Sequence, residues 1–239
     1  MAAASDTLRL LTALEHLRPD QNYLLGLPVN QETGVEHLTP LLAAFLCNVN
    51  STIEPLEVQG QVNSLEGSVR EFFKELTQAP RFARSHVSVS ETEGIRFGLA
   101  TAVNRMPNAP VYLSDQAKCG LPGAVLALGA ELVTIGTRLD GTMDAVELRR
   151  AVAAGTARRP DSGAIILAIC GNAETGAVDD ISELRLAASA AGRVYVHTDA
   201  TLGGMVAGYA PSGPSWSFQH GADSVSISAH RVLGSTPFS

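Results

Sequence analysis

The sequence predicts an α/β fold with a mostly parallel sheet and helices on both faces, and three observations lead to this prediction. Short strand-like runs alternate with helical segments of roughly 10–15 residues, which is the pattern of βαβ units. The near-continuous apolar run "AIILAIC" (164–170) indicates a strand buried on both faces. Polar segments stand where ligands bind in such folds, beyond the carboxyl ends of the strands.

The first part of the chain has a different pattern. Leucines repeat every three residues over residues 6–17, which predicts a short helix. Residues 22–34 have the composition of a loop, and residues 35–49 form an apolar, partly helical segment. We therefore expect residues 1–50 to form an N-terminal helix and loop segment, and residues 51–239 to form one large domain.

The elements of the large domain follow in order. An amphipathic pattern over residues 64–78 predicts its first helix. The predicted strands cover residues 86–90, 110–114, 131–137, 163–170, 193–199 and 223–228. The predicted helices between these strands cover residues 92–106, 120–130, 144–157 and 180–192.

Bulk composition excludes several classes of protein. The chain has 239 residues and a net charge of −7, and its basic residues are scattered, so nucleic acid is not an expected partner. No apolar run is long enough to span a bilayer, and the N-terminus lacks the pattern of a secretory signal. Cys47, Cys119 and Cys170 are too widely spaced for a metal site or a disulfide framework. We expect a soluble, cytoplasmic protein without a metal.

Four polar segments resemble the loops of a known enzyme family. They are "SETEG" (90–94), "SDQAK" (114–118), "HTDA" (197–200) and "SAHR" (228–231). At these loops the chain resembles the pyridoxal-phosphate-dependent group II amino-acid decarboxylases, with bacterial histidine decarboxylase as the nearest branch. Further matches are "LGLPVN" (25–30), "VNSLEG" (62–67), "GAVDD" (176–180), "HTDATLGGM" (197–205) and "DSVSISAHRVLGS" (223–235).

The resemblance implies the large domain of a fold type I pyridoxal-phosphate transferase, with a seven-stranded type of sheet and a homodimeric assembly. Members of the family continue into a small C-terminal domain that closes over the substrate. This sequence ends a few residues after Arg231, so we expect that domain to be absent.

Two residues match the family's ring-binding segment. The resemblance implies that Asp199 pairs with the pyridine nitrogen of the cofactor, which keeps the ring protonated as an electron sink. A simpler alternative is that Asp199 caps a turn at the end of a strand. His197 is retained beside it, and a structural hydrogen-bonding role suits it as well as a catalytic one.

The phosphate loop departs from the family pattern. Relatives have a small Gly/Ser pair before Thr-Glu-Gly, so that backbone N–H groups at a helix N-terminus can bind phosphate. Here Ser90 and Glu91 precede Thr92, Glu93 and Gly94. Glu91 would bring a negative charge next to a phosphate dianion. Alternatively, Glu91 turns to solvent and the following residues only begin a helix.

The covalent and ring-stacking positions are also changed. Lys118 stands in place of the histidine that lies over the ring; it could form an imine itself, or it could be a solvated loop lysine. Arg231, after His230, replaces the lysine that holds the cofactor. A guanidinium stays protonated and cannot take that role, but it can bind a carboxylate or phosphate through two hydrogen bonds. In "GNAETG" (171–176), Glu174 adds a carboxylate that could act as an acid or base or could point outward.

These changes led to an expectation of no cofactor, or of pyridoxal phosphate bound only weakly or without a covalent bond. The first hypothesis is a repurposed enzyme that joins an amino acid or arylethylamine to an aldehyde, with a Pictet–Spengler-type cyclisation as its extension. Asp199, Glu174 or Lys118 would move protons and Arg231 would hold an anionic group. One alternative is an inactive, decarboxylase-like partner subunit, and another is residual decarboxylation of an amino acid.

Overall fold

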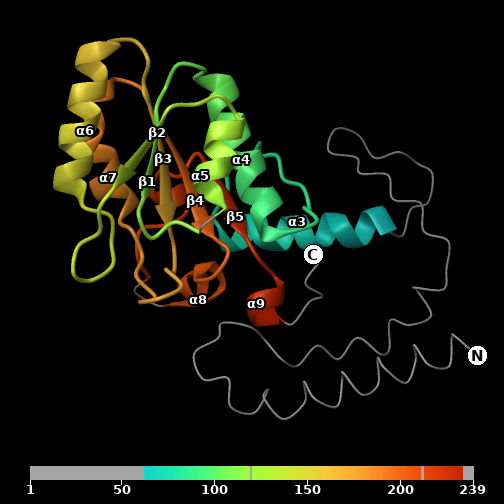
Figure 1. Cartoon of the computed structure of the whole chain (residues 1–239). Coiled ribbons are helices and arrows are strands. Elements are labelled where there is room, and N and C mark those ends of the chain that lie inside the picture. Colours follow the sequence, from blue (N-terminus) through green and yellow to red (C-terminus); the bar gives the residue numbers. More distant parts are fainter. Residues whose placement is uncertain (1–61, 119, 211–212, 234–239) are drawn as a thin grey trace, which may run out of the picture.

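The computed structural model describes residues 62–118, 120–210 and 213–233, which form an α/β fold around a parallel sheet (Figure 1). The sheet has five strands in the order β2-β1-β3-β4-β5, and every neighbouring pair is parallel. The strands are β1 (Val111–Ser114), β2 (Leu132–Ile135), β3 (Ala164–Ile169), β4 (Val194–Ala200) and β5 (Ser224–Ile227). The predicted fold class is therefore confirmed, and the described part holds five strands of the expected seven-stranded type of sheet.

Helices cover both faces of this sheet. They are α3 (Val62–Leu76), α4 (Glu91–Arg105), α5 (Leu121–Ala127), α6 (Ala145–Arg158), α7 (Ile181–Ala187), α8 (Gly204–Tyr209) and α9 (His230–Leu233), with short 3-10 turns at Ser189–Ala191 and Phe218–His220. In Figure 1, α6 and α7 lie on one side of the sheet, and α4 and α5 lie on the other. The crossover helix α5 thus lies on one face and the next two, α6 and α7, lie on the other, so both faces of the parallel sheet are covered.

The core has two parts because successive strand residues point to opposite faces. Tyr112 and Ile166 pack with buried residues of α6 and α7. Leu113 and Ile165 pack with buried residues of α4 and α5. Every residue of β3 is buried, as the run "AIILAIC" predicts for a central strand covered on both faces.

Some predicted elements differ from the structure. Residues 86–90 form no strand: Ser88 Oγ donates to the Ser90 carbonyl, and the chain then turns into α4. Valines alternate there, but no strand of the described residues pairs with this segment. The short helices α8 and α9 were not predicted. The predicted helix over residues 6–17, with the segment up to residue 50, lies outside the described residues.

Helix α4 lies unusually close to the sheet through Gly94 and Gly98, four residues apart and therefore on one face. A Cβ atom on Gly98 would lie 2.2 Å from Cε1 of His197 on β4. A Cβ atom on Gly94 would lie 3.7 Å from Ser226 Oγ on β5 and 3.1 Å from Ser88 Oγ in the segment before α4. This close approach brings the N-terminus of α4 to the carboxyl ends of β4 and β5.

We expect Gly98→Ala to destabilise the fold by about 2 kcal/mol, because the added methyl must displace a buried imidazole and overpacking outweighs the gain in helix propensity. Gly123→Ala on α5 is the matched control, since no atom lies within 4 Å of the added Cβ. The control should be neutral or slightly stabilising. Urea unfolding of both variants measures the difference, and equal effects would show that α4 has room at Gly98.

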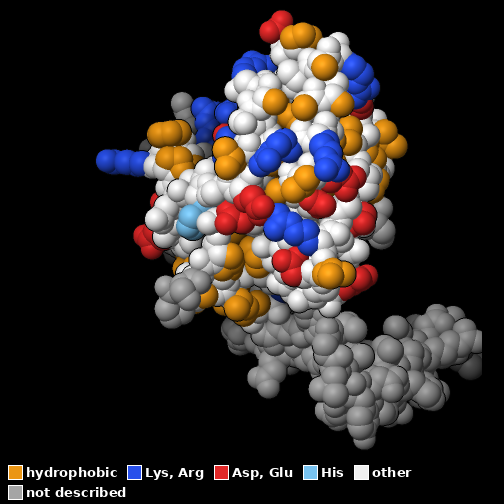
Figure 2. Space-filling model, turned by 90° about the vertical axis from the view of Figure 1, so that its left-hand side faces the viewer, with side chains coloured by type: hydrophobic (Ala, Val, Ile, Leu, Met, Phe, Trp, Pro, Cys, Tyr) orange, Lys and Arg blue, Asp and Glu red, His pale blue; other side chains and the backbone are white. Residues whose placement is uncertain are grey.

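Charged side chains of both signs are interspersed on the α6–α7 side of the molecule, which Figure 2 displays. Ion pairs join these helices to the loops that flank β2: Arg138 pairs with Glu183 on α7, and Arg158 on α6 pairs with Glu131. In the part of the chain that the structure describes, no helix is both long and apolar enough to cross a membrane.

Candidate functional site

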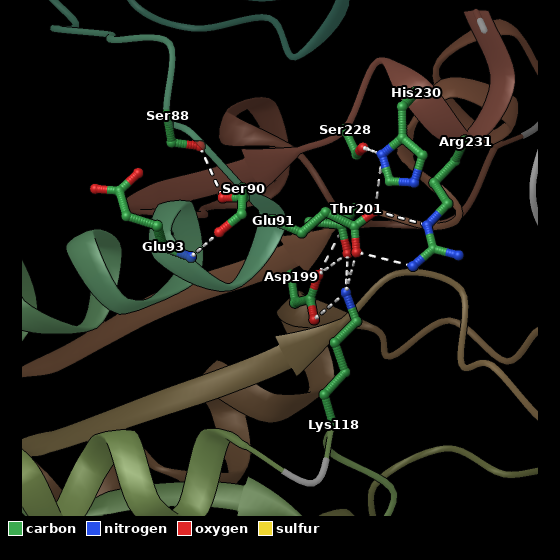
Figure 3. A network of polar contacts seen from close by, with 10 residues as sticks. All are labelled: Ser88, Ser90, Glu91, Glu93, Lys118, Asp199, Thr201, Ser228, His230 and Arg231. Atoms are coloured by element: carbon green, nitrogen blue, oxygen red, sulfur yellow. Dashed lines mark hydrogen bonds and ion pairs between the residues drawn. The ribbon is translucent and has the colours of Figure 1, made fainter. Parts of the chain in front are cut away.

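Four segments far apart in the sequence meet at the carboxyl edge of the sheet (Figure 3). Glu91 begins α4, Lys118 follows β1, Asp199 stands near the end of β4, and Arg231 lies in α9 after β5. In a parallel sheet these strand ends lie at one edge, which is where the sequence predicts a ligand site. The four side chains are joined by hydrogen bonds and ion pairs, and we call them the charged cluster.

Glu91 is the centre of the charged cluster. Its carboxylate accepts two hydrogen bonds from Arg231, at 2.6 Å from Nε and 3.0 Å from Nη2, and one from Lys118 Nζ at 3.1 Å. The Glu91 side chain is only 12% exposed, so it does not turn to solvent. Burial acts to raise the pKa of Glu91, but the hydrogen bonds and charges of Arg231 and Lys118 outweigh burial and lower that pKa to about 2.

Asp199 is buried at the end of β4, beside Lys118. Its Oδ1 accepts hydrogen bonds from the backbone N–H of Thr201 at 3.1 Å and from the Thr201 hydroxyl at 2.6 Å. Its Oδ2 lies 3.7 Å from Lys118 Nζ, which is an ion pair beyond hydrogen-bonding distance. Lys118 Nζ also donates to Thr201 Oγ, so Thr201 links the amine to the carboxylate.

Thr201 is a site residue that the sequence reasoning missed. The signal was present in "HTDAT", because an aspartate often binds the backbone and side chain two residues later. The same turn that Asp199 caps therefore brings the threonine hydroxyl to Lys118. The capping and site roles foreseen for Asp199 do not exclude each other.

His230 lies at the edge of the charged cluster. Its Nδ1 is 3.5 Å from Glu91 Oε1 and 3.0 Å from Ser228 Oγ. These contacts place the imidazole on the same carboxylate as Arg231. Both residues that end "SAHR" therefore face Glu91, as Figure 3 shows.

The remaining residues of the "SETEG" loop serve mainly to start α4. Ser90 is the N-cap and accepts a hydrogen bond from the Glu93 backbone N–H at 3.2 Å. Thr92 is exposed, and the Glu93 carboxylate lies 4.0 Å from His86. Gly94 packs against Ser88, as described above.

His197 is buried under α4, next to the charged cluster but not in it. Its Nδ1 is 2.7 Å from Ser224 Oγ, and its Nε2 is 3.2 Å from Ser226 Oγ. Burial lowers the pKa of His197 to about 4, although the nearby Asp199 charge opposes this shift. The geometry supports the structural hydrogen-bonding role allowed for this residue, since it ties β4 to β5 beneath Gly98.

Glu174 is separate from the charged cluster. It is exposed on the loop after β3, and its backbone N–H donates to Asn172 Oδ1 at 2.7 Å. Neither Lys118 nor Asp199 contacts its side chain. Within the described ranges, no group of three or more His, Cys, Asp or Glu side chains lies close enough to hold a metal ion.

An apolar groove of about 450 Å³ lies between α8 and α9. It is lined by Met205, Val206, Tyr209, Ala210, Val232 and Leu233. Its lining is almost wholly apolar, so the groove offers no charged side chain to a ligand, in contrast to the charged cluster.

Comparisons with known proteins point in one direction, although no family model matches the chain. The chain is 27% identical to a serine decarboxylase 2 of Oryza sativa subsp. japonica, over 92% of this chain and 47% of that protein. It is 26% identical to a histidine decarboxylase of Pseudomonas entomophila, over 98% of this chain and 58% of that protein. The chain therefore spans about half the length of the curated relatives it matches.

Solved structures agree on the fold. An L-methionine decarboxylase from Streptomyces sp. 590 superposes with a TM-score of 0.78 at 17% identity, covering 96% of this chain and 66% of that one. A TDC of Oryza sativa, solved with PLP and tryptamine, has a TM-score of 0.57 at 16% identity, covering 97% of this chain and 62% of that one. The predicted resemblance to these decarboxylases, and their fold, are thus confirmed.

One expectation is wrong. The altered loops led us to expect no cofactor, or pyridoxal phosphate bound only weakly. The sequence relatives are named serine and histidine decarboxylases, and one structural neighbour was solved with PLP, so the comparisons point to pyridoxal phosphate as the cofactor rather than to none. The sequence reasoning took Arg231, Lys118 and Glu91 together as a loss of cofactor binding and did not foresee that Arg231 pairs with Glu91.

Proposed function

Because the chain resembles the pyridoxal-phosphate-dependent group II amino-acid decarboxylases, we propose that it binds pyridoxal phosphate at the charged cluster and acts as a lyase on an amino acid. The observation that carries this proposal is the position of Lys118, whose amine lies between Asp199 and Glu91 at the carboxyl edge of the sheet. An aldehyde cofactor needs a primary amine, and Arg231 cannot supply one.

Few lysines could bind the aldehyde of the cofactor. The whole sequence contains two lysines, Lys74 and Lys118. Lys74 lies on α3, where its Nζ pairs with Glu71 at 2.7 Å. Lys118 is therefore the lysine within the candidate site, and a count of lysines in the sequence would already have singled it out.

The described residues fit the two ends of the cofactor differently. Asp199 Oδ2 accepts no hydrogen bond from the described residues but is ion-paired with Lys118, so it could accept the N–H of a protonated ring once the Lys118 amine has turned from it to the aldehyde. Lys118 would hold the aldehyde, and the Arg231 guanidinium suits the phosphate. The Glu91 charge opposes the phosphate, and in the structure Glu91 is paired with Arg231 and Lys118. When bound, the cofactor serves as an electron sink for a carbanion at the α-carbon of the substrate.

Thr201 and the charged cluster together offer a path by which Lys118 can lose a proton without solvent. Lys118 Nζ must lose a proton before its lone pair can react. The Thr201 hydroxyl accepts a hydrogen bond from Lys118 and donates one to Asp199 Oδ1, so it can relay that proton. Glu91 Oε2 is a second acceptor for Lys118, at 3.1 Å.

Addition of pyridoxal phosphate to the purified chain should give a visible absorption band and a rise in thermal stability. Incubation of the loaded protein with a panel of amino acids should then release an amine and carbon dioxide. Loss of the band during gel filtration, together with no amine product, would contradict the proposal.

An inactive, decarboxylase-like partner subunit is the second candidate, and one observation favours it. The charges of Lys118, Arg231, Glu91 and Asp199 balance within the charged cluster. These ion pairs stabilise the folded chain whether or not it catalyses a reaction. Cofactor binding without amine release would support this candidate. The condensation of an amine with an aldehyde was derived from a site without cofactor, and we do not propose it.

The expected homodimer remains part of the proposal. Exposed apolar side chains support it: Phe82 and Val89 in the segment before α4 are 87% and 70% exposed, and Phe97 on α4 is 53% exposed. Light scattering of the full chain, with and without pyridoxal phosphate, measures the oligomeric state.

A further inference from the structure

We infer that Glu91 is an internal counter-anion, seated in an oxyanion-binding site made by Arg231, Lys118 and His230, and that a phosphate-bearing ligand binds there by displacing it. This inference rests on the proposed function because it concerns the phosphate end of the same site. It names the residue that controls which anions the site accepts.

The contacts of Glu91 are those of a bound anion. Two nitrogens of the Arg231 guanidinium face its two oxygens, at 2.6 and 3.0 Å, which is the fork geometry that also recognises phosphate. Lys118 adds an ammonium at 3.1 Å, and His230 adds an imidazole at 3.5 Å. These groups come from two other segments, so they form a receptor that does not belong to α4.

The charges explain why Glu91 must leave when a phosphate binds. Glu91 and Asp199 carry two negative charges, which balance the two positive charges of Lys118 and Arg231. A phosphate dianion added to this balanced set would face Glu91 without compensation. If the Glu91 carboxylate rotates away, the phosphate meets the same donors with the repulsion removed.

A purely structural role makes a different prediction. If Glu91 only ties α4 to α9, its loss weakens the fold and leaves anion binding unchanged. Glu93 provides a matched control, because it lies in the same first turn of α4 and carries the same charge. Its carboxylate lies near His86 and is outside the charged cluster.

The test compares the parent chain, Glu91→Gln and Glu93→Gln in thermal-shift titrations with inorganic phosphate. We expect the phosphate midpoint of Glu91→Gln to fall by about tenfold or more, with Glu93→Gln matching the parent. Addition of Arg231→Gln to Glu91→Gln should remove the response. Equal midpoints for the parent and Glu91→Gln would overturn the inference.

Two further arms complete the design. Acetate in place of phosphate separates a phosphate receptor from a general carboxylate receptor, and we expect the weaker response for acetate. Glu91→Asp keeps the charge on a shorter side chain, so it covers the case in which Glu91→Gln does not fold. Its phosphate midpoint should lie below that of the parent, and an unchanged midpoint would overturn the inference. Inorganic phosphate has no aldehyde. A negative result in these titrations would therefore not test the proposal that the Lys118 amine holds the aldehyde of the cofactor.

Discussion

Lys118→Arg should abolish covalent capture of pyridoxal phosphate. The substitution keeps a positive charge beside Asp199 and Glu91, but a guanidinium cannot form the bond to an aldehyde. After borohydride reduction of the parent protein with the cofactor, mass spectrometry should find the added mass on the peptide that contains Lys118. The variant should carry no added mass and no visible absorption band.

Lys74→Arg is the control, because it changes the other lysine of the chain on the helix α3. It should leave the capture of the cofactor at the parent level. If Lys118→Arg still acquired the added mass, or if the mass were found on Lys74, the assignment of the site amine to Lys118 would be wrong.

The fold should lose about 3 kcal/mol of stability as the pH falls from 6.5 to 4, because of His197 alone. Burial lowers the pKa of His197 from 6.5 to about 4. Between these values the unfolded chain binds a proton that the folded chain does not, so the free energy of unfolding decreases as the pH decreases. Above the unfolded pKa this contribution is fully present.

Urea unfolding at a series of pH values measures this loss. His197→Gln should reduce its slope between pH 6.5 and 4, whereas His220→Gln, outside the sheet, should keep it. Glu91 contributes at lower pH, because its pKa is lowered from 4.5 to about 2 and its stabilisation is lost below 4.5. If the free energy of unfolding of His197→Gln still fell with pH as steeply as that of the parent, groups other than His197 would be responsible for the loss.

The local sequence pattern predicted most of the sheet because each strand has a distinct apolar run. Segment 163–170 could only be a buried strand, and β3 is buried throughout. The segment 86–90 has the same alternation of valines but lacks a neighbour in the described sheet, and its serines bond locally instead. Strand pairing is a property of the assembled fold, so a local pattern cannot supply it.

The site was harder to predict for a related reason. The sequence indicated that four loops converge, and Lys118, Asp199 and Arg231 do meet. It identified Glu91 as unfavourable to a phosphate, but it did not indicate that Arg231 and Lys118 pair with Glu91. Its neutralisation depends on side chains from two other segments, and only their positions in three dimensions reveal this.

The bond between Glu91 and Arg231 also has a consequence for the order of folding. The two residues are 140 positions apart in the sequence, and Lys118 and Thr201 are 83 apart. Arg231 lies in α9, after β5, so we expect its contact with Glu91 to form only once β5 has docked onto β4. In refolding experiments, the ability to bind phosphate should therefore appear after the burial of the central strands. Ligand binding at this edge would then report that β5 has joined the described sheet.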